Sequence, residues 1–252
     1  MSAFEKLSTL YKLFFHRYKQ SYYSQSGEDV VLNNWIRKDI KRGFFVDVGC
    51  YHPKKFSNTY FLYKRGWRGV NIDLEQSKID WMNKFRKEDI NVLAAVSDKA
   101  TEVMIYTDSK YSLGSFISAS SVVFKNYYHA GKIITKTLNQ ILDATKYKNQ
   151  EIDLLSIDVE GHDFNVLLSL NIYKYKPKII LIESPLRDIN KIVSSELYGF
   201  LSNNKYELVN WVGYTLFFIN PKKAWPLLNM DHPEFRALAE ANQRHVYGIK
   251  KF

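Results

Sequence analysis

Acidic residues stand at the ends of the apolar runs of this sequence. The run in GFFVDVG ends on Asp47 and Gly49, and the run in RGVNID ends on Asp73. If these runs are parallel strands, their carboxyl ends meet at one edge of the sheet, where open α/β sheets bind their ligands. Acids gathered at one edge repel one another unless a cation or hydrogen-bond donors lie among them. Later runs end on further acids, namely Asp98, Asp158, Glu160 and Glu183.

The first two strand ends are typical of a nucleoside-binding site. Gly49 would let a ligand approach the backbone closely, and Asp73, 26 residues after Asp47, is placed to accept hydrogen bonds from a ribose diol. The next glycine is Gly66, so the loop lacks the G-x-G-x-x-G pattern that a dinucleotide pyrophosphate needs. A cofactor with ribose and adenine but no phosphate fits better, and S-adenosylmethionine is such a molecule. Asp47 could bind its ammonium group, and helix-terminal amides could bind its carboxylate. The expected helix start comprises Ser57, Asn58 and Thr59.

A second group of titratable residues follows the apolar run in IDLLSIDVEGHD. Methyl transfer to a hydroxyl needs oxygen, methyl and sulfur held in line and a base that removes the hydroxyl proton. His162 has a suitable pKa near neutral pH, with Asp158 and Glu160 beside it, and His52 is a second candidate base. Two alternatives stay open. In the first, these residues serve only as caps or as favourable charges at the N-terminus of a helix. In the second, Asp158 and Glu183 bind a divalent metal together with a histidine.

Strands and helices that would position these residues alternate along the chain. Short apolar runs separated by segments of helical spacing predict βαβ units and a parallel sheet. Thr137 and Gln140 form a T-x-x-Q capping box that opens the helix LNQILDAT, and Gly66 ends the helix TYFLYKR. The spacing in SKIDWMNKFRK and KIVSSELYGFLSNN predicts two further helices, with Phe85 and Val193 on their core-facing sides. The expected parallel strands lie at residues 43–49, 68–73, 90–97, 152–158 and 177–184.

The last two apolar runs, YELVNWV and YTLFFIN, predict an antiparallel hairpin that closes the sheet. A mostly parallel seven-stranded sheet with such a hairpin, and helices on both faces, is the Rossmann-like fold of class I methyltransferases. TEVMIYT predicts an added edge strand or hairpin arm, and the serine-rich span 108–121 predicts a functional loop. We expect this domain to cover residues 23–220, between an amphipathic N-terminal helix over residues 1–22 and a helical extension over residues 221–252.

Several segments resemble, in the same order, the FkbM-type S-adenosylmethionine-dependent methyltransferases. They are SQSGEDVVL, FFVDVGCYHPKKFSNTYFLYKRGWRGVNID, AAVSD, and LLSIDVEGHDFNVLLSL followed by KPKIILIE, and together they span roughly residues 22–220. Members of this family are class I methyltransferases that typically O-methylate sugars, polyketides or other small natural products. The chain departs from many members at Tyr51, His52 and Pro53, where a small residue and a second glycine are common.

The resemblance implies a set of cofactor-binding residues. Asp47, Gly49 and Asp73 would bind S-adenosylmethionine. Gln25 and Glu28 would reach its methionine end. Two residues expected near the adenine are Ser97 and Asp98. Adjacent residues at the same strand ends complete the candidate set, namely Cys50, Tyr51, Leu74, Val96 and Asp158.

Composition limits the compartment and the partners. The longest apolar runs are far shorter than the roughly 18 residues of a membrane span, and the single cysteine, Cys50, excludes an internal disulfide. We therefore expect a cytoplasmic protein without a membrane span, with a homodimer as a further expectation. The net charge of +10 suits an anionic, phosphate-bearing acceptor. Basic residues expected near the cofactor-side loop are Lys54, Lys55, Lys64, Arg65 and Arg68.

The leading hypothesis is an O-methyltransferase that acts on a small-molecule hydroxyl. The expected acceptor is a sugar or a nucleotide-linked sugar in natural-product or polysaccharide biosynthesis, such as that of a capsule. The alternatives are a nucleic-acid methyltransferase and a non-catalytic adenosine-ligand-binding protein. Base-directed nucleic-acid enzymes usually carry an Asn/Asp-Pro-Pro-aromatic motif or a cysteine beside proline, and neither occurs here. Ribose-directed enzymes resemble a pattern with lysine at the position of Glu183. A nucleic-acid partner is therefore not expected.

Overall fold

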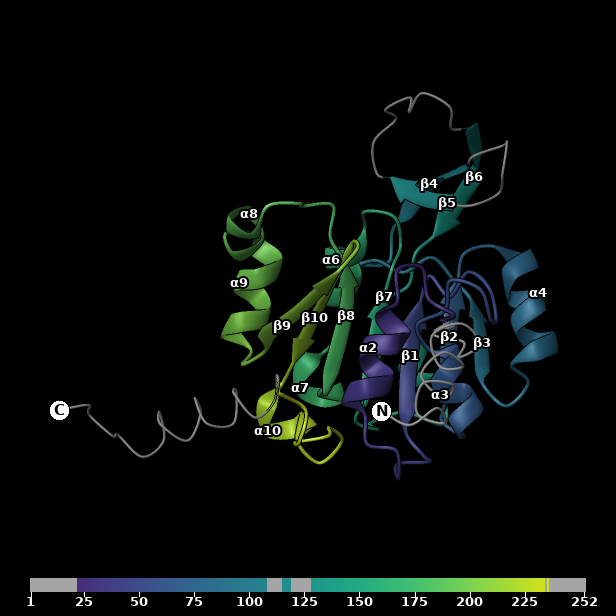
Figure 1. The fold of residues 1–252 in the computed structure, drawn as a ribbon. Coiled ribbons are helices and arrows are strands. Elements are labelled where there is room, and N and C mark those ends of the chain that lie inside the picture. The colour runs from purple at the N-terminus through teal and green to yellow at the C-terminus, as the bar shows by residue number, and fades with distance from the viewer. Residues whose placement is uncertain (1–21, 108–114, 119–127, 234, 236–252) are drawn as a thin grey trace, which may run out of the picture.

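A seven-stranded sheet forms the centre of the structure, a computed structural model that describes residues 22–107, 115–118, 128–233 and 235. Its strand order is β3-β2-β1-β7-β8-β10-β9 (Figure 1). The first five strands of this order are parallel, and β10 runs antiparallel to both β8 and β9. This arrangement confirms the predicted class I methyltransferase fold. The strands are β1 (Phe44–Val48), β2 (Arg68–Asp73), β3 (Ile90–Leu93), β7 (Leu154–Ile157), β8 (Ile179–Glu183), β9 (Glu207–Val212) and β10 (Thr215–Ile219).

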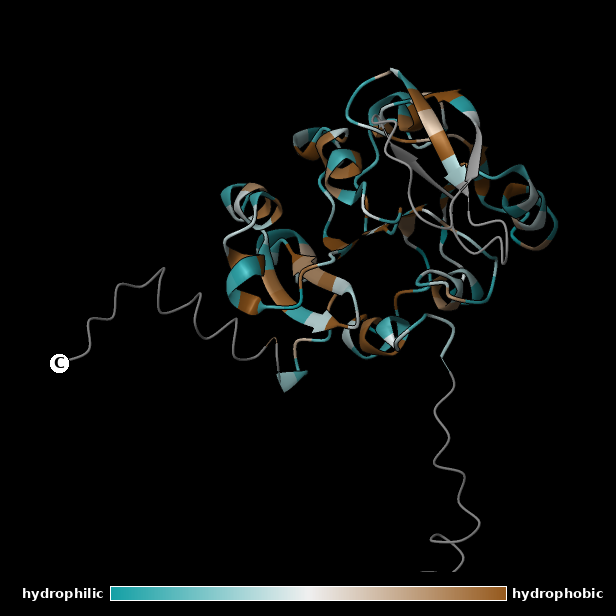
Figure 2. Ribbon diagram, turned by 90° about the horizontal axis from the view of Figure 1, so that it is seen from above, coloured by the Kyte–Doolittle hydropathy of each residue, from teal (hydrophilic) through white to brown (hydrophobic). Residues whose placement is uncertain are grey.

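Helices cover both faces of the sheet, because successive strand residues point to opposite faces and both faces are apolar. Phe44, Val46 and Val48 of β1 belong to one buried cluster, and Phe45 belongs to the other. Figure 2 shows brown and teal residues alternating along the covering helices, as expected for helices with one buried side. Helices α2 (Glu28–Trp35), α3 (Tyr60–Arg65) and α10 (Pro221–Ala224) cover the face of Phe45. Helices α5 (Leu138–Asp143), α6 (Asp163–Leu168), α7 (Ile172–Tyr175), α8 (Ile189–Val193) and α9 (Glu196–Asn203) cover the other.

A second, three-stranded sheet lies above the carboxyl end of the main sheet in Figure 1. It contains TEVMIYT as its central strand, so of the two predicted alternatives the edge strand is wrong, whereas the hairpin arm is confirmed by the antiparallel pairing of this segment with the next strand. The strand predicted at 90–97 stops at Leu93, and Val96 makes only an isolated bridge with Lys136. The chain therefore leaves the main sheet before residue 101. The strands are β5 (Ser115–Ser118), β4 (Glu102–Thr107) and β6 (Tyr128–Ile134), and the other residues of the serine-rich span lie outside the described residues.

Helix ends follow the predicted signals, whereas two helix faces do not. The capping box of Thr137 and Gln140 is present, and Gly66 ends α3 in the left-handed region at φ 104°. Phe85, at the end of α4 (Gln76–Phe85), is 49% exposed instead of buried, and Val193, at the end of α8, is 42% exposed. The helix predicted over KIVSSELYGFLSNN is split into α8 and α9, because the Ser195 side chain accepts a hydrogen bond from the Tyr198 amide and starts a new helix.

The two ends of the chain are described only in part. The predicted helix over residues 1–22 falls almost entirely outside the described residues. Within the predicted extension, α10, Leu227, Leu228 and Phe235 pack against Trp35 in one core, and residues 234 and 236–252 of the extension lie outside the described residues. No helix in the described ranges is long and apolar enough to cross a membrane.

Candidate active site

A cavity of about 220 Å³ opens at the carboxyl edge of the sheet, where strand order reverses between β1 and β7. In doubly wound sheets this switch point is the place where ligands bind. The ends of β1, β2 and β7 and the segment after β3 all contribute to its wall. The lining residues are Gln25, Val48, Gly49, Tyr51, Phe56, Ile72, Asp73, Leu74, Lys78, Ala94, Ala95, Val96, Asp158, Val159, Glu160 and His162.

Gly49 allows the loops after β1 and β7 to approach each other. It has φ +81°, which favours glycine, and a Cβ on it would lie 1.7 Å from the carbonyl oxygen of Asp158. The amide of Gly49 donates to the carbonyl of Ile72 at 2.9 Å, so the turn is also tied to β2. The predicted close approach at Gly49 is therefore present, and here the neighbouring group is protein backbone.

Asp73 lies at the end of β2 with its carboxylate at the cavity wall. It accepts hydrogen bonds from the amides of Tyr51 and Glu75, at 3.1 and 3.0 Å. Burial raises the pKa of Asp73, and the nearby Lys78 ammonium opposes that change. Lys78 Nζ lies 3.9 Å from Asp73 and 2.9 Å from Glu75, and 5.0 Å from the centre of the Tyr51 ring. Asp73 is thus held in place and faces the cavity, as a diol-binding carboxylate must.

The cavity wall fits the parts of S-adenosylmethionine in their expected order. Asp73 could accept hydrogen bonds from the ribose hydroxyls, and Leu74, Ala95 and Val96 offer an apolar surface for adenine beside it. The tight turn at Gly49 leaves backbone next to the cavity without a side chain in between. The residues present therefore fit this cofactor.

His162 joins the loop after β7 to the segment after β3. Its Nε2 lies 2.8 Å from the Ser97 hydroxyl, which in turn lies 2.9 Å from Asp98 Oδ1. Burial lowers the pKa of His162, while the negative charge of Asp98 opposes that shift. The hydrogen bond from Ser97 lowers the pKa of Asp98. Ser97 and Asp98 do not line the cavity, and their predicted place near adenine stays a prediction.

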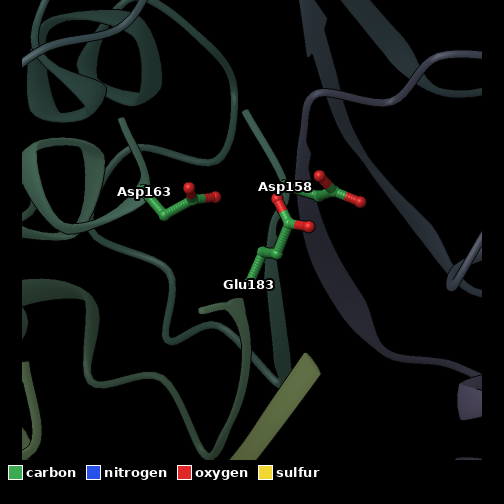
Figure 3. A group of neighbouring side chains, drawn as sticks. All are labelled: Asp158, Asp163 and Glu183. Atoms are coloured by element: carbon green, nitrogen blue, oxygen red, sulfur yellow. The ribbon is translucent and has the colours of Figure 1, made fainter. Parts of the chain in front are cut away.

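Three carboxylates meet beside the cavity at the ends of β7 and β8. Figure 3 shows the carboxylates of Asp158 and Glu183 close together, with Asp163 of α6 directed toward them, and one oxygen of each lies within 4.8 Å of the others. Burial and the charge of Glu183 raise the pKa of Asp158 well above its usual range. Burial also raises the pKa of Asp163 to about 7 and, with the charge of Asp163, that of Glu183 to about 7.

The same three carboxylates are the residues that could hold a divalent cation. Carboxylate oxygens are the ligands that hard cations prefer. The predicted pair of Asp158 and Glu183 is present. Among the described residues the group also contains Asp163, and it does not contain the predicted histidine. Asp163 is already engaged, because it accepts hydrogen bonds from the amides of Val159 and Gly161, both at 2.9 Å.

Asp47 faces away from the cavity, into a buried polar network on the α3 side of the sheet. Its Oδ2 accepts a hydrogen bond from the Thr59 hydroxyl at 2.7 Å, and Thr59 also accepts from the Arg86 guanidinium at 3.2 Å. Arg86 pairs with Asp89 at 2.8 Å, and both side chains are fully buried. Burial raises the pKa of Asp47, and its contacts with Thr59 and Arg86 oppose that change. The predicted contact of Asp47 with an ammonium group stays a prediction.

Other predicted residues lie around the cavity without lining it. Glu28 accepts a hydrogen bond from the Ser26 amide at 2.8 Å. Cys50 is buried against α4. The Ser57 hydroxyl accepts from the amides of Thr59 and Tyr60, so these helix-terminal amides already have partners. Asn58 donates to the Ser156 hydroxyl at 3.2 Å.

His52 is held in the loop after β1, outside the cavity wall. Its Nδ1 accepts hydrogen bonds from the amides of Lys54 and Lys55, both at 3.0 Å, and its ring packs edge-on against Trp81. Burial and the two lysine charges lower its pKa. Of the two candidate bases, the structure therefore brings only His162 to the cavity.

Sequence reasoning missed seven lining residues, namely Val48, Phe56, Ile72, Lys78, Ala94, Ala95 and Val159. Ala94 and Ala95 directly follow β3, so their place at a strand end was a usable signal. Phe56 has φ 55° and Tyr51 has φ 50°, and such left-handed positions are not marked by glycine in this loop.

A comparison with protein families agrees with this geometry. The model of the methyltransferase FkbM domain matches residues 47–208, which is more than half of the chain. That range contains the strand ends that form most of the cavity wall. No curated protein matches the chain.

Two solved structures are similar in outline. One is a TehB-like SAM-dependent methyltransferase from Corynebacterium glutamicum, 12% identical, with a TM-score of 0.38 over 85% of this chain and 94% of that one. The other is a putative rRNA methylase from Clostridium thermocellum, 10% identical, with a TM-score of 0.41 over 77% of this chain and 92% of that one. Because the family model matches residues 47–208, the chain belongs to the FkbM family and is a methyltransferase that uses S-adenosylmethionine.

Proposed function

We propose that this methyltransferase transfers a methyl group to the hydroxyl oxygen of a small molecule, a sugar or a nucleotide-linked sugar. One observation carries the proposal. The same cavity is lined at one end by Asp73, suited to a ribose, and at another by Asp158, Glu160 and His162, which can exchange a proton. A hydroxyl acceptor needs such a group, because its proton must leave as the oxygen attacks.

His162 is the residue best suited to accept that proton. Its lowered pKa keeps the imidazole neutral near pH 7, so a ring nitrogen is free to act as a base. Asp158 has a strongly raised pKa and is therefore suited to orient the acceptor as a hydrogen-bond donor. When bound, S-adenosylmethionine supplies a methyl group activated by its sulfonium. The chain's part is then to hold the acceptor in line and take its proton.

A phosphate-bearing acceptor is supported by two lysines on the loop after β1. Within the described ranges neither Lys54 nor Lys55 takes part in a salt bridge, whereas Arg68 is paired with Glu88. Lys55 Nζ lies 4.7 Å from the centre of the Phe56 ring, and Phe56 lines the cavity. The ammonium group of Lys55, next to a lining residue, and that of the adjacent Lys54, which lies over the Phe85 ring at 5.6 Å, would attract a phosphate or diphosphate group.

We also propose a cytoplasmic location, a domain over residues 23–220 and a homodimer. A nucleotide-linked sugar would be available in the cytoplasm, and the buried thiol of Cys50 is compatible with a reducing compartment. Light scattering on the full chain tests the dimer, because a monomer mass at micromolar concentration would contradict it.

The activity test is S-adenosylhomocysteine formation with a panel of acceptors. The panel comprises nucleotide-linked sugars, sugar phosphates, free sugars, polyketide alcohols and RNA. We expect turnover with at least one sugar and more with its phosphorylated forms. His162→Ala should reduce this turnover, and Asp39→Asn, at an exposed residue paired with Arg37, is the control. Turnover with RNA and no other acceptor would contradict the proposal. So would a lack of turnover with every acceptor of the panel although the cofactor binds.

A further inference from the structure

We propose that Ser97 and Asp98 are positioning residues that fix which nitrogen of His162 accepts the proton. In this arrangement Nε2 carries the hydrogen and Nδ1 is the acceptor. The inference deepens the proposed function and rests on it, because it concerns the base of that same reaction. It gives Ser97 and Asp98 a role other than the contact with adenine that the family resemblance implies.

The geometry begins with the Ser97 hydroxyl, which lies between a carboxylate oxygen and a ring nitrogen. Its oxygen is 2.9 Å from Asp98 Oδ1 and 2.8 Å from His162 Nε2. Ser97 is 4% exposed, so solvent does not compete freely for these contacts. A hydroxyl has a single hydrogen and can donate only once. Its second contact must therefore be one in which the oxygen accepts.

The charge of Asp98 decides which contact receives the hydrogen. An ionised carboxylate can only accept hydrogen bonds, and the pKa of Asp98 is lowered by its bond with Ser97. If Ser97 donated to His162 instead, its oxygen would face a carboxylate oxygen at 2.9 Å with no hydrogen between them. The arrangement that satisfies both contacts has Ser97 donating to Asp98 and His162 Nε2–H donating to Ser97.

The other ring nitrogen of His162 is thereby left as the acceptor. A neutral imidazole has one donor and one acceptor nitrogen, so Nδ1 carries the lone pair. Among the described residues no hydrogen bond reaches Nδ1, whereas the corresponding atom of His52 accepts two. His162 also lines the cavity. Nδ1 is therefore the atom that can take the proton of a bound hydroxyl.

The backbone around His162 is fixed as well. The carbonyl of His162 accepts a hydrogen bond from the Val166 amide at 3.2 Å, which ties the residue to the first turn of α6. A ring held through its backbone and through Nε2 can rotate little. Such a support is what a base needs, because a small misplacement of its nitrogen slows the transfer of a proton.

The first test is nitrogen NMR on the uniformly 15N-labelled full chain at pH 8. Long-range 1H–15N correlations show which ring nitrogen carries the hydrogen, and the His162→Gln spectrum identifies the signal. We expect the hydrogen on Nε2 in the unaltered protein. Asp98→Asn removes the charge that draws the Ser97 hydrogen, because a carboxamide can donate to Ser97 as well as accept from it, so part of the ring hydrogen should move from Nε2 to Nδ1. Asp39→Asn should leave the spectrum unchanged. A hydrogen on Nδ1 in the unaltered protein would overturn the proposal.

The second test is kinetic and uses the acceptor identified in the panel. Ser97→Ala and Asp98→Asn should each lower kcat by roughly 10- to 100-fold, part of what a general base contributes, with the acceptor KM little changed. Unchanged kcat in both variants would overturn the positioning role. The NMR result needs neither cofactor nor acceptor, so it decides the tautomer even if no acceptor is found, a failure that counts against the proposed function alone. Calorimetry with S-adenosylhomocysteine checks that each variant remains folded.

Discussion

Two groups of buried and half-buried acids lie along the same sheet, and only one of them includes a positively charged side chain. Beneath α3, Asp47 and Asp89 share a network with the fully buried Arg86. At the ends of β7 and β8, Glu183 and its two neighbours face one another, with no lysine or arginine paired to them in the described part of the chain. Both groups cost free energy to bury, and they are compensated in different ways.

The difference separates a structural group from a chemical one. The positive charge of Arg86 compensates the carboxylates of Asp47 and Asp89, and its guanidinium packs over the rings of Phe45 and Tyr63. We therefore expect this network to stabilise the fold. In the second group burial and mutual repulsion raise pKa values to about 7. Groups that exchange protons near neutral pH are typical of functional sites.

Loss of the buried cation should give the largest effect on stability. Arg86→Leu would leave Asp89 and Asp47 buried without a positive charge, and breaking a buried pair in this way costs about 3–5 kcal/mol. Urea unfolding followed by circular dichroism measures this change in the free energy of unfolding. Arg37→Leu is the matched control, since Arg37 and Asp39 are exposed and such pairs contribute about 0–1 kcal/mol. Equal losses of unfolding free energy in Arg86→Leu and Arg37→Leu would show that the buried network of Arg86 does not stabilise the fold more than an exposed ion pair does.

Loss of the proposed base should affect catalysis and spare stability. His162→Ala is expected to lower kcat by about 100-fold or more, while calorimetry should show nearly unchanged binding of S-adenosylhomocysteine. His162 directly precedes Asp163 of the second group, at the edge of the sheet where we expect chemistry instead of structural support. A rate equal to that of the unaltered enzyme would remove His162 as the base.

The smallest expected effect is a change in how stability depends on pH. The pKa of Glu183 is raised to about 7 in the folded chain from an ordinary value of 4.5. The folded state therefore binds more protons than the unfolded state between pH 4.5 and 7, and stability is lost as pH rises through this range. Glu183→Gln should reduce the fall in Tm between pH 5 and pH 8 by about 2–4 °C.

Scanning calorimetry at the two pH values measures this difference. Glu102→Gln is the control, because Glu102 is exposed and paired with Lys132. If the fall in Tm between pH 5 and pH 8 is the same in Glu183→Gln as in the unaltered chain, the pKa of Glu183 is not raised in the folded state.

The fold could be predicted from the sequence because its signals are local. The runs that form β1 and β2 were bounded by glycine and acids, and β2 covers Arg68–Asp73 as expected. The break between α8 and α9 also had a local signal, since Ser194 and Ser195 stand where a serine can compete for helix amides. The three-stranded sheet was harder, because β4 and β6 pair across a long insertion.

Site residues could be predicted from the sequence only where the end of a strand places them at the cavity. Asp73 and Asp158 line the cavity as expected. Asp47 has the same position at the end of a strand, yet its neighbours include Arg86, 39 residues further along the chain. The bond between Ser97 and His162 spans 65 residues. The contact of Asp47 with Arg86 and that of Ser97 with His162 cannot be predicted from the local sequence pattern, because each depends on how segments far apart in the chain meet in the fold.

The central claim is that the cavity at the switch point binds S-adenosylmethionine through Asp73. Calorimetric titration of the purified chain with S-adenosylhomocysteine tests it most directly, with NAD as the competing ligand and Asp73→Ala as the variant. We predict micromolar binding of S-adenosylhomocysteine, no comparable binding of NAD, and a loss of about 10- to 100-fold in the variant, as for hydrogen bonds to a charged group. Tighter binding of NAD, or equal binding of S-adenosylhomocysteine by the variant, would contradict this account of the site.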